Sequence, residues 1–199
     1  MSLSLSTAPT LEPVTLAEAK GHLRLDADDS TEDAYLTALI AAARHQVEAH
    51  TSRALLNQTW AWKLDDFPHC DQIRVPKAPL SSVTSITYID TAGTTQTWAA
   101  SNYDVDAPDG PRAQMGTISL AFEKAYPVVR SDRNAVTITF VAGYGAAATA
   151  VPQDVRQAAL LLIAEMYERR EEGLIGTIQT EVPLSVSRIL SSYVSGGWD

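Results

Sequence analysis

The sequence predicts an α+β fold: a helical core, a β-rich insertion within it, and a C-terminal docking tail. Apolar residues recur at helical spacing near both ends of the chain, whereas the middle alternates with a period of two. The core is expected to combine an N-terminal helical hairpin with a long C-terminal helix. We predict one domain over residues 1–199, with the helical core at 14–56 and 150–173, the insertion at 57–145 and the tail at 174–199.

The N-terminal hairpin is predicted from a helix start and two apolar stripes. Thr15 and Glu18 match a capping box, in which each side chain accepts a hydrogen bond from the other residue's backbone N–H. An aspartate-rich link follows, and Ser30 and Asp33 mark the start of a second helix. The second stripe has helical spacing and comprises Leu36, Leu39, Ile40, Ala43 and Val47.

Strands are predicted between residues 58 and 142. Trp60, Trp62 and Leu64 alternate with less apolar residues, as in a half-buried strand. Thr91-Ala92-Gly93 separates two β-prone runs and predicts a hairpin turn. The further predicted strands are 83–90, 94–98, 103–105, 117–122 and 136–141.

A third helix is predicted after Pro152, which suits a first helical turn because it needs no N–H there. Gly173 is a candidate end for this helix. Beyond it the chain looks less like core, yet a short amphipathic helix follows Pro183. Such a tail docks on its own domain or on a neighbour, and both options stay open. Its candidate partner-binding residues are Leu184, Val186, Ile189, Leu190, Tyr193 and Trp198.

Charge and composition exclude several classes of protein. The 199 residues hold 24 acidic and 15 basic side chains, a net charge of −9 without a basic cluster, which argues against gripping nucleic acid. A single cysteine, Cys70, excludes an internal disulfide framework. No run approaches the roughly 20 apolar residues of a membrane span, and the first residues do not resemble a signal peptide. We therefore expect a cytoplasmic site of synthesis and no membrane partner.

Candidate chemistry is weak throughout the chain. Residues 65–71 (DDFPHCD) and 104–109 (DVDAPD) gather ligand-type side chains, but their spacing fits no zinc or calcium motif. We predict no catalytic residue, no cofactor and no metal site, although residues distant in sequence could still converge into an unrecognised enzyme. Four charged residues at a helix end form either a solvated end or an inter-subunit ion network: Arg169, Arg170, Glu171 and Glu172.

Five segments in this order resemble one family. They are LEPVTLAEAKGHLR (11–24), LIAAARHQVEA (39–49), PLSSVTSITYID (79–90), VAGYG (141–145) and VPQDVRQAALLLIAEMYERR (151–170). The set is similar to the head–tail connector, or adaptor, proteins of tailed phages and gene transfer agents. Each motif is weak alone, and the specificity lies in the set.

The resemblance implies a structural virion protein at the head–tail junction and no enzyme. It implies a homo-oligomeric ring, typically a dodecamer, beneath the portal protein. The C-terminal segment of each copy would contact the portal, and the opposite face of the ring would receive the next tail component (the stopper). DNA would pass through the ring without sequence-specific binding, and a net negative charge suits such a channel. The alternatives are another ring-forming virion protein, such as a stopper or tail terminator, and an unrecognised enzyme.

Overall fold

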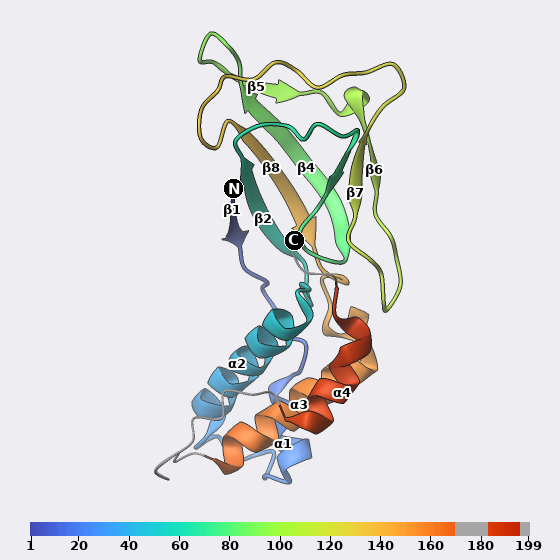
Figure 1. The fold of residues 1–199 in the computed structure, drawn as a ribbon. Helices are drawn as coiled ribbons and strands as arrows, with labels where there is room; N and C mark the ends of the chain where they lie inside the picture. Colours follow the sequence, from blue (N-terminus) through green and yellow to red (C-terminus); the bar gives the residue numbers. More distant parts are fainter. Residues whose placement is uncertain (170–182, 196–199) are drawn as a thin grey trace, which may run out of the picture.

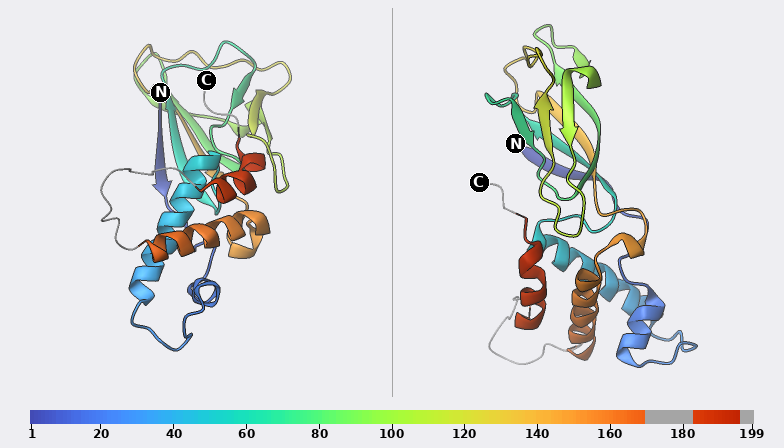
Figure 2. Two further views of the ribbon diagram at one scale, coloured as in Figure 1. Left: turned by 60° about the horizontal axis from the view of Figure 1, so that its bottom comes forward. Right: turned by 90° about the vertical axis from the view of Figure 1, so that its right-hand side faces the viewer.

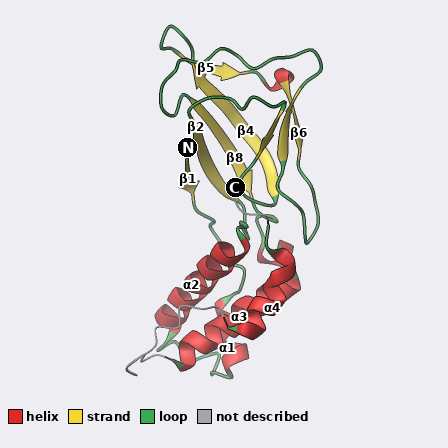
Figure 3. Cartoon of the chain, viewed as in Figure 1, coloured by secondary structure: helices red, strands yellow, loops and turns green. Residues whose placement is uncertain are grey.

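The chain folds into two lobes, one of strands and one of helices (Figures 1 and 3). The computed structural model describes residues 1–169 and 183–195. The β lobe contains every described strand, and the helical lobe contains all four described α-helices. The chain starts in the β lobe, enters the helical lobe, returns to the β lobe and ends its described part beside the junction of the two lobes.

The helical lobe consists of α1 (Leu16–Leu23), α2 (Asp33–Thr51), α3 (Gln153–Glu168) and α4 (Leu184–Leu190). The α3 helix contacts each of the other three helices. The capping box predicted at Thr15 and Glu18 is present, with the Thr15 N–H donating to Glu18 Oε2 at 2.8 Å. The shared hydrophobic cluster includes Leu39, Ile40, Val47, Val155, Leu162 and Ile163.

Two antiparallel sheets form the β lobe. The larger sheet has the order β1-β2-β8-β4-β5 and the smaller sheet the order β3-β7-β6. Figure 2 (right) shows the smaller sheet lying against one face of the larger. The strands are β1 (Ser2–Thr7), β2 (Gln58–Leu64), β3 (Gln72–Arg74), β4 (Leu80–Ile89), β5 (Thr95–Trp98), β6 (Tyr103–Asp106), β7 (Thr117–Leu120) and β8 (Val136–Ala142).

The register of the larger sheet separates an apolar face from a hydroxyl-rich face. Trp62 pairs with Ile138, and Ile138 pairs with Ile86, so these three side chains share the inner face. Together with Ile73 and Ile118 of the smaller sheet they belong to a second hydrophobic cluster. The opposite face carries mainly serine and threonine, including Ser4, Thr59, Ser85, Thr87, Thr97, Thr137 and Thr139.

The predicted fold, a helical core with a long C-terminal helix and an inserted β region, is wrong. The structure is a mixed α+β fold with two separate hydrophobic clusters, one in each lobe. The two sheets bury each other's inner faces, so the strands need no helical core. The α3 helix has 16 residues and ends at Glu168, α2 with 19 residues is longer, and α4 has only seven.

Most expected strands are present, and two strands were not predicted. The strands expected at 83–90, 94–98, 103–105, 117–122 and 136–141 correspond to β4, β5, β6, β7 and β8. The unpredicted β1 has little burial of its own, since five of its six residues are exposed. The other, β3, has three residues and is too short for a periodic signal. Because β1 precedes α1, the β lobe is not built from one continuous segment.

Candidate partner-binding segment and the lobe junction

The C-terminal segment consists of α4 and the 3₁₀ turn Ser191–Tyr193, and it packs on the helical lobe. Pro183 starts α4, with the Ser187 N–H donating to its carbonyl oxygen at 2.8 Å. Val186 and Leu190, four residues apart, lie on one helix face, and both are buried in the helical cluster. Leu184 is 78% exposed and points away from that cluster.

The predicted partner-binding residues therefore fall into separate groups. Val186, Leu190 and Tyr193 are buried in the chain's own helical cluster, and Ile189 is partly buried against it. Of the two options that the sequence leaves open for this segment, docking on its own domain is the one found for those residues. Leu184 is exposed, and Trp198 lies outside the described residues. A role in partner binding stays a prediction for all six.

Arg53 fixes this segment at the lobe junction, which we define as Thr51–Arg53, Ala113 and Tyr193–Ser195. Its side chain is 1% exposed, and its Nη1 donates to the carbonyl oxygen of Ala113 at 2.7 Å. Its Nε donates to the carbonyl oxygen of Tyr193. Ser195 donates through its backbone N–H to the Thr51 carbonyl oxygen at 3.0 Å. One buried guanidinium thus joins the end of α2, the loop between β6 and β7, and the C-terminal segment.

The Tyr193 side chain extends the junction to α3. Its hydroxyl donates to Asp154 Oδ2 at 3.2 Å, and the Arg112 guanidinium lies 5.8 Å from its ring centre. Burial, reinforced by the negative charge of Asp154, raises the pKa of the Tyr193 hydroxyl above its ordinary value of 10.0. The hydroxyl therefore stays protonated at neutral pH and remains a hydrogen-bond donor.

A second buried network lies next to the junction, around Glu48. Its Oε2 accepts a hydrogen bond from Arg44 Nη1 at 3.0 Å, and its Oε1 accepts from the backbone N–H of Leu55 at 3.0 Å. The Gln58 side-chain amide also donates to Oε1. Arg44 Nε reaches Glu12 at 2.8 Å. The network connects the segment before α1, the α2 helix and the first residue of β2.

Neither network is predicted from the sequence. An isolated Arg53 or Glu48 matches no motif, because its partners come from distant parts of the chain. The sequence Ser52-Arg53-Ala54-Leu55-Leu56 does carry a weak signal: a charged residue directly before an apolar run needs partners if that run is buried.

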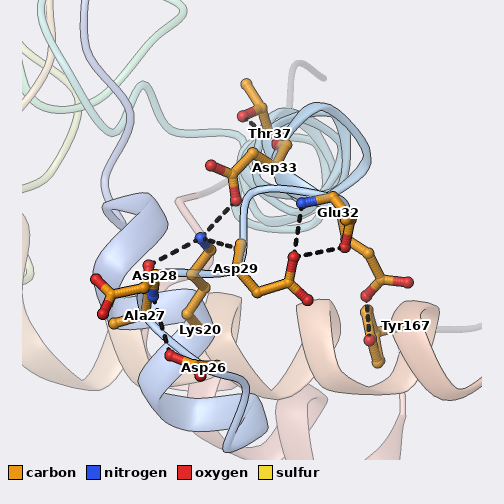
Figure 4. A network of polar contacts seen from close by, with 10 residues as sticks. Lys20, Asp26, Ala27, Asp28, Asp29, Glu32, Asp33, Thr37 and Tyr167 are labelled. Carbon is orange, nitrogen blue, oxygen red and sulfur yellow. Dashed lines mark hydrogen bonds and ion pairs between the residues drawn. The ribbon is translucent and has the colours of Figure 1, made fainter.

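A polar cluster at the far end of the helical lobe joins α1, α2 and α3 (Figure 4). The Lys20 ammonium group lies 2.6 Å from Asp33 Oδ1 and donates to the carbonyl oxygens of Asp29 (2.7 Å) and Ala27 (3.3 Å). The Tyr167 hydroxyl of α3 donates to Glu32 Oε2. The cluster holds the acidic link between α1 and α2 in place, so its aspartates have a structural role.

The predicted inter-subunit cluster is only partly described. Arg169 Nη1 lies 3.1 Å from Glu165 Oε1 within the same chain, and both side chains are partly solvent-exposed. Arg170, Glu171 and Glu172 lie outside the described residues.

Two further features concern metal binding and membrane insertion. Within residues 1–169 and 183–195, no group of three or more His, Cys, Asp or Glu side chains could hold a metal ion. None of the helices in this part of the chain is long and apolar enough to cross a membrane.

The chain belongs to the class of two-lobed α+β folds, and its C-terminal segment is fixed where the two lobes meet. The sequence is similar to a known family: the model of the phage gp6-like head–tail connector protein family matches residues 13–108. No curated protein matches the chain.

Solved structures extend the similarity over the whole chain. A chain in the neck of an empty gene transfer agent particle, computed with C6 symmetry, has a TM-score of 0.80 and 28% identity, covering 100% of this chain and 98% of that one. A chain in the virion of a native gene transfer agent particle gives the same values. In the native neck computed with C12 symmetry, a chain reaches a TM-score of 0.70 at 27% identity, with the same coverage.

These findings confirm the predicted resemblance to head–tail connector proteins. They also support the predicted role, a structural adaptor in the neck of a virion.

Proposed function

We propose that this chain is a head–tail adaptor that forms a ring beneath the portal of a phage or phage-like particle. The observation that carries the proposal is the similarity over 100% of the chain, at 28% identity, to a chain of a gene transfer agent neck. The relatives' necks were computed with C6 and C12 symmetry, which favours a ring of twelve copies. The role is mechanical, and we propose no catalytic activity.

The proposed partners are the portal protein on one face of the ring and the next tail component, the stopper, on the other. DNA passes through the ring without sequence-specific binding. The net charge of −9 supports this passage, because an acidic wall does not hold phosphates. We further propose that residues 1–199 act as one adaptor domain, because Arg53 and Tyr193 join the two lobes through buried hydrogen bonds.

For the portal contact we propose the C-terminal part of the chain. Leu184 is the described residue most suited to it, since its apolar side chain is 78% exposed while Val186 and Leu190 on the same helix are buried. Trp198 and the ion network of Arg169, Arg170, Glu171 and Glu172 are proposed as further contacts with the portal and between copies, respectively. Val186, Leu190 and Tyr193 then hold α4 in the position from which Leu184 is presented.

Portal binding of purified protein tests the proposal. Native mass spectrometry and electron microscopy of portal complexes, with and without this protein, should show a ring of added copies. Leu184→Ser should weaken the attachment tenfold or more without unfolding the chain, whereas Val105→Ser, at a 40% exposed position in the β lobe, serves as the matched control. A wild-type protein that stays monomeric and ignores the portal would contradict the adaptor function.

A further inference from the structure

The loop between β6 and β7, residues 107–116, is fastened to the junction of the lobes. In Figure 1 it extends from these two strands toward the helical lobe. Arg53 Nη1 donates to the Ala113 carbonyl oxygen at 2.7 Å, and the Tyr144 hydroxyl donates to the Pro111 carbonyl oxygen at 2.8 Å. Both donors lie outside the two sheets, and Ala113 is 5% exposed. The position of this loop therefore depends on contacts outside its own sheet.

The C-terminal segment, residues 183–195, holds the same arginine from the other side. Arg53 Nε donates to the Tyr193 carbonyl oxygen, and the Arg112 guanidinium of the loop lies 5.8 Å from the Tyr193 ring centre. The α4 helix continues without a break into the 3₁₀ turn that ends at Tyr193. Leu184 and Tyr193 are thus opposite ends of one helical unit, so a contact that fixes Leu184 also fixes an acceptor of Arg53.

Burial ties the loop and the C-terminal segment to each other. The Arg53 side chain is always charged and only 1% exposed, so water cannot replace a lost acceptor while the junction stays closed. When Tyr193 moves away, Arg53 reaches water only if the junction opens, and its hydrogen bond to Ala113 then competes with water. The junction therefore has a closed state, with both carbonyl groups bound, and an open state, in which the loop and the segment are released together.

A partner bound at Leu184 favours the closed state. Val186 and Leu190 are buried in the helical cluster, so α4 presents Leu184, which is 78% exposed, from a fixed position. In the open state the same side chain lies on a released segment, and ordering that segment on binding costs conformational entropy. A partner with the higher affinity for the closed state shifts the junction toward it.

We propose that Arg53 couples portal attachment to the position of the β lobe. A portal bound at Leu184 keeps the C-terminal segment docked, and Arg53 then holds the β6–β7 loop against the helical lobe. Arg53 is a positioning residue, because it is buried and acts through Tyr193 and Ala113. This coupling rests on the proposed portal contact at Leu184, and through it portal binding fixes the two lobes relative to each other.

A buried thiol in the loop measures the coupling. In a Cys70→Ser background, Ala113→Cys places a cysteine at a position that is 5% exposed, and its rate of reaction with DTNB reports how often the loop opens. Saturating portal complexes should slow this reaction about tenfold or more. Adding Arg53→Met should speed the reaction of the free chain about tenfold or more, because the two carbonyl groups lose their donor. The portal should then give no protection, although native mass spectrometry still detects its binding.

Two further variants separate the coupling from a general loss of stability. Ile138→Ala removes buried apolar volume from the β lobe cluster and destabilises the fold without touching the contacts of Arg53. In this variant the portal should still protect the reporter thiol. Arg53→Lys keeps the buried charge but offers one nitrogen instead of a planar fork, so it should lose the protection. It replaces Arg53→Met if that chain does not fold.

The outcomes distinguish this coupling from the adaptor function. If the portal protects the reporter thiol equally with and without Arg53, the portal covers the loop directly and the coupling is wrong. If the portal binds the chain that retains Arg53 but gives no protection, or if Ile138→Ala loses the protection as Arg53→Met does, the coupling is wrong and the adaptor function stands. If the chain that retains Arg53 does not bind the portal at all, both proposals fail.

Discussion

Arg53 Nη1 donates a hydrogen bond to the carbonyl oxygen of Ala113 at 2.7 Å, across 60 residues of sequence. The same guanidinium donates to the carbonyl oxygen of Tyr193, 140 residues farther along the chain. Because Arg53 is 1% exposed, these carbonyl groups have replaced water as its partners. Arg53 is therefore a main link between the C-terminal segment and the β lobe, beside the Arg112 guanidinium that lies 5.8 Å from the Tyr193 ring centre.

Removing this side chain should destabilise the protein substantially. Arg53→Met leaves the buried carbonyl oxygens of Ala113 and Tyr193 without their donors, which is expected to cost about 3 kcal/mol of unfolding free energy. Urea denaturation followed by tryptophan fluorescence measures this change. Arg112→Met is the matched control, since Arg112 is exposed and its guanidinium lies 5.8 Å from the Tyr193 ring centre, and about 1 kcal/mol or less is expected. Equal losses in both variants would refute the central role of Arg53.

The Glu48 network should show strong coupling between its members. Glu48→Ala removes the acceptor for Arg44, Leu55 and Gln58, and it leaves a buried cation partly uncompensated. We expect a loss of about 3 kcal/mol. Glu12→Ala, which removes the more exposed partner of Arg44, should cost about 1 kcal/mol or less. A double-mutant cycle on Arg44 and Glu48 checks the coupling, and additive single effects would contradict it.

Two glycines should respond to alanine in opposite directions. Gly143 has φ of 143°, and a Cβ there would overlap the backbone of Leu56 and Asn57. Neither the dihedral nor the neighbouring backbone can adjust cheaply, so Gly143→Ala should cost about 3 kcal/mol or more. Gly21 lies in α1 with nothing within 4 Å of the added Cβ, and Gly21→Ala should stabilise by about 0.5–1 kcal/mol. Thermal denaturation of both variants measures the contrast, and a stable Gly143→Ala protein would contradict the packing described.

Glu18 should contribute to stability only above acidic pH. The Thr15 N–H holds the pKa of the Glu18 carboxyl below its ordinary value of 4.5, and Arg156 lowers it further against the effect of burial. The unfolded chain therefore binds a proton first, so this contribution is present above pH 4.5 and is lost as the pH falls below that value. Glu18→Gln should therefore reduce the dependence of the unfolding free energy on pH below 4.5. NMR titration of the Glu18 side chain checks the direction, and a midpoint at or above 4.5 would refute it.

Local signals predicted much of the secondary structure. The capping box at Thr15, the stripe through Leu36 and Val47, and the alternation from Trp60 to Leu64 each act within a few residues. Such patterns can be recognised because one turn of helix or one strand face repeats in the sequence. The β1 strand escaped prediction because its pairing with β2 lies more than 50 residues away.

The arrangement of these elements could not be predicted in the same way. The apolar runs show that residues such as Ile138 and Leu162 are buried, but not that they belong to different clusters. The predicted helical core was wrong because the two sheets supply apolar surface to each other. The sequence predicts a partner-binding stripe at the tail residues Val186 and Leu190. Only the packing of α4 on α2 and α3 shows that these side chains are buried within the same chain.

The sequence by itself determined most of the secondary-structure elements, the acidic charge and the resemblance to head–tail connectors, because these depend on local pattern and composition. Only the tertiary structure decided the two lobes, the junction at Arg53 and the exposure of Phe122. Burial and hydrogen bonding between distant segments depend on how the whole chain packs. An arginine or a phenylalanine in the sequence therefore does not reveal whether it joins two lobes or faces solvent.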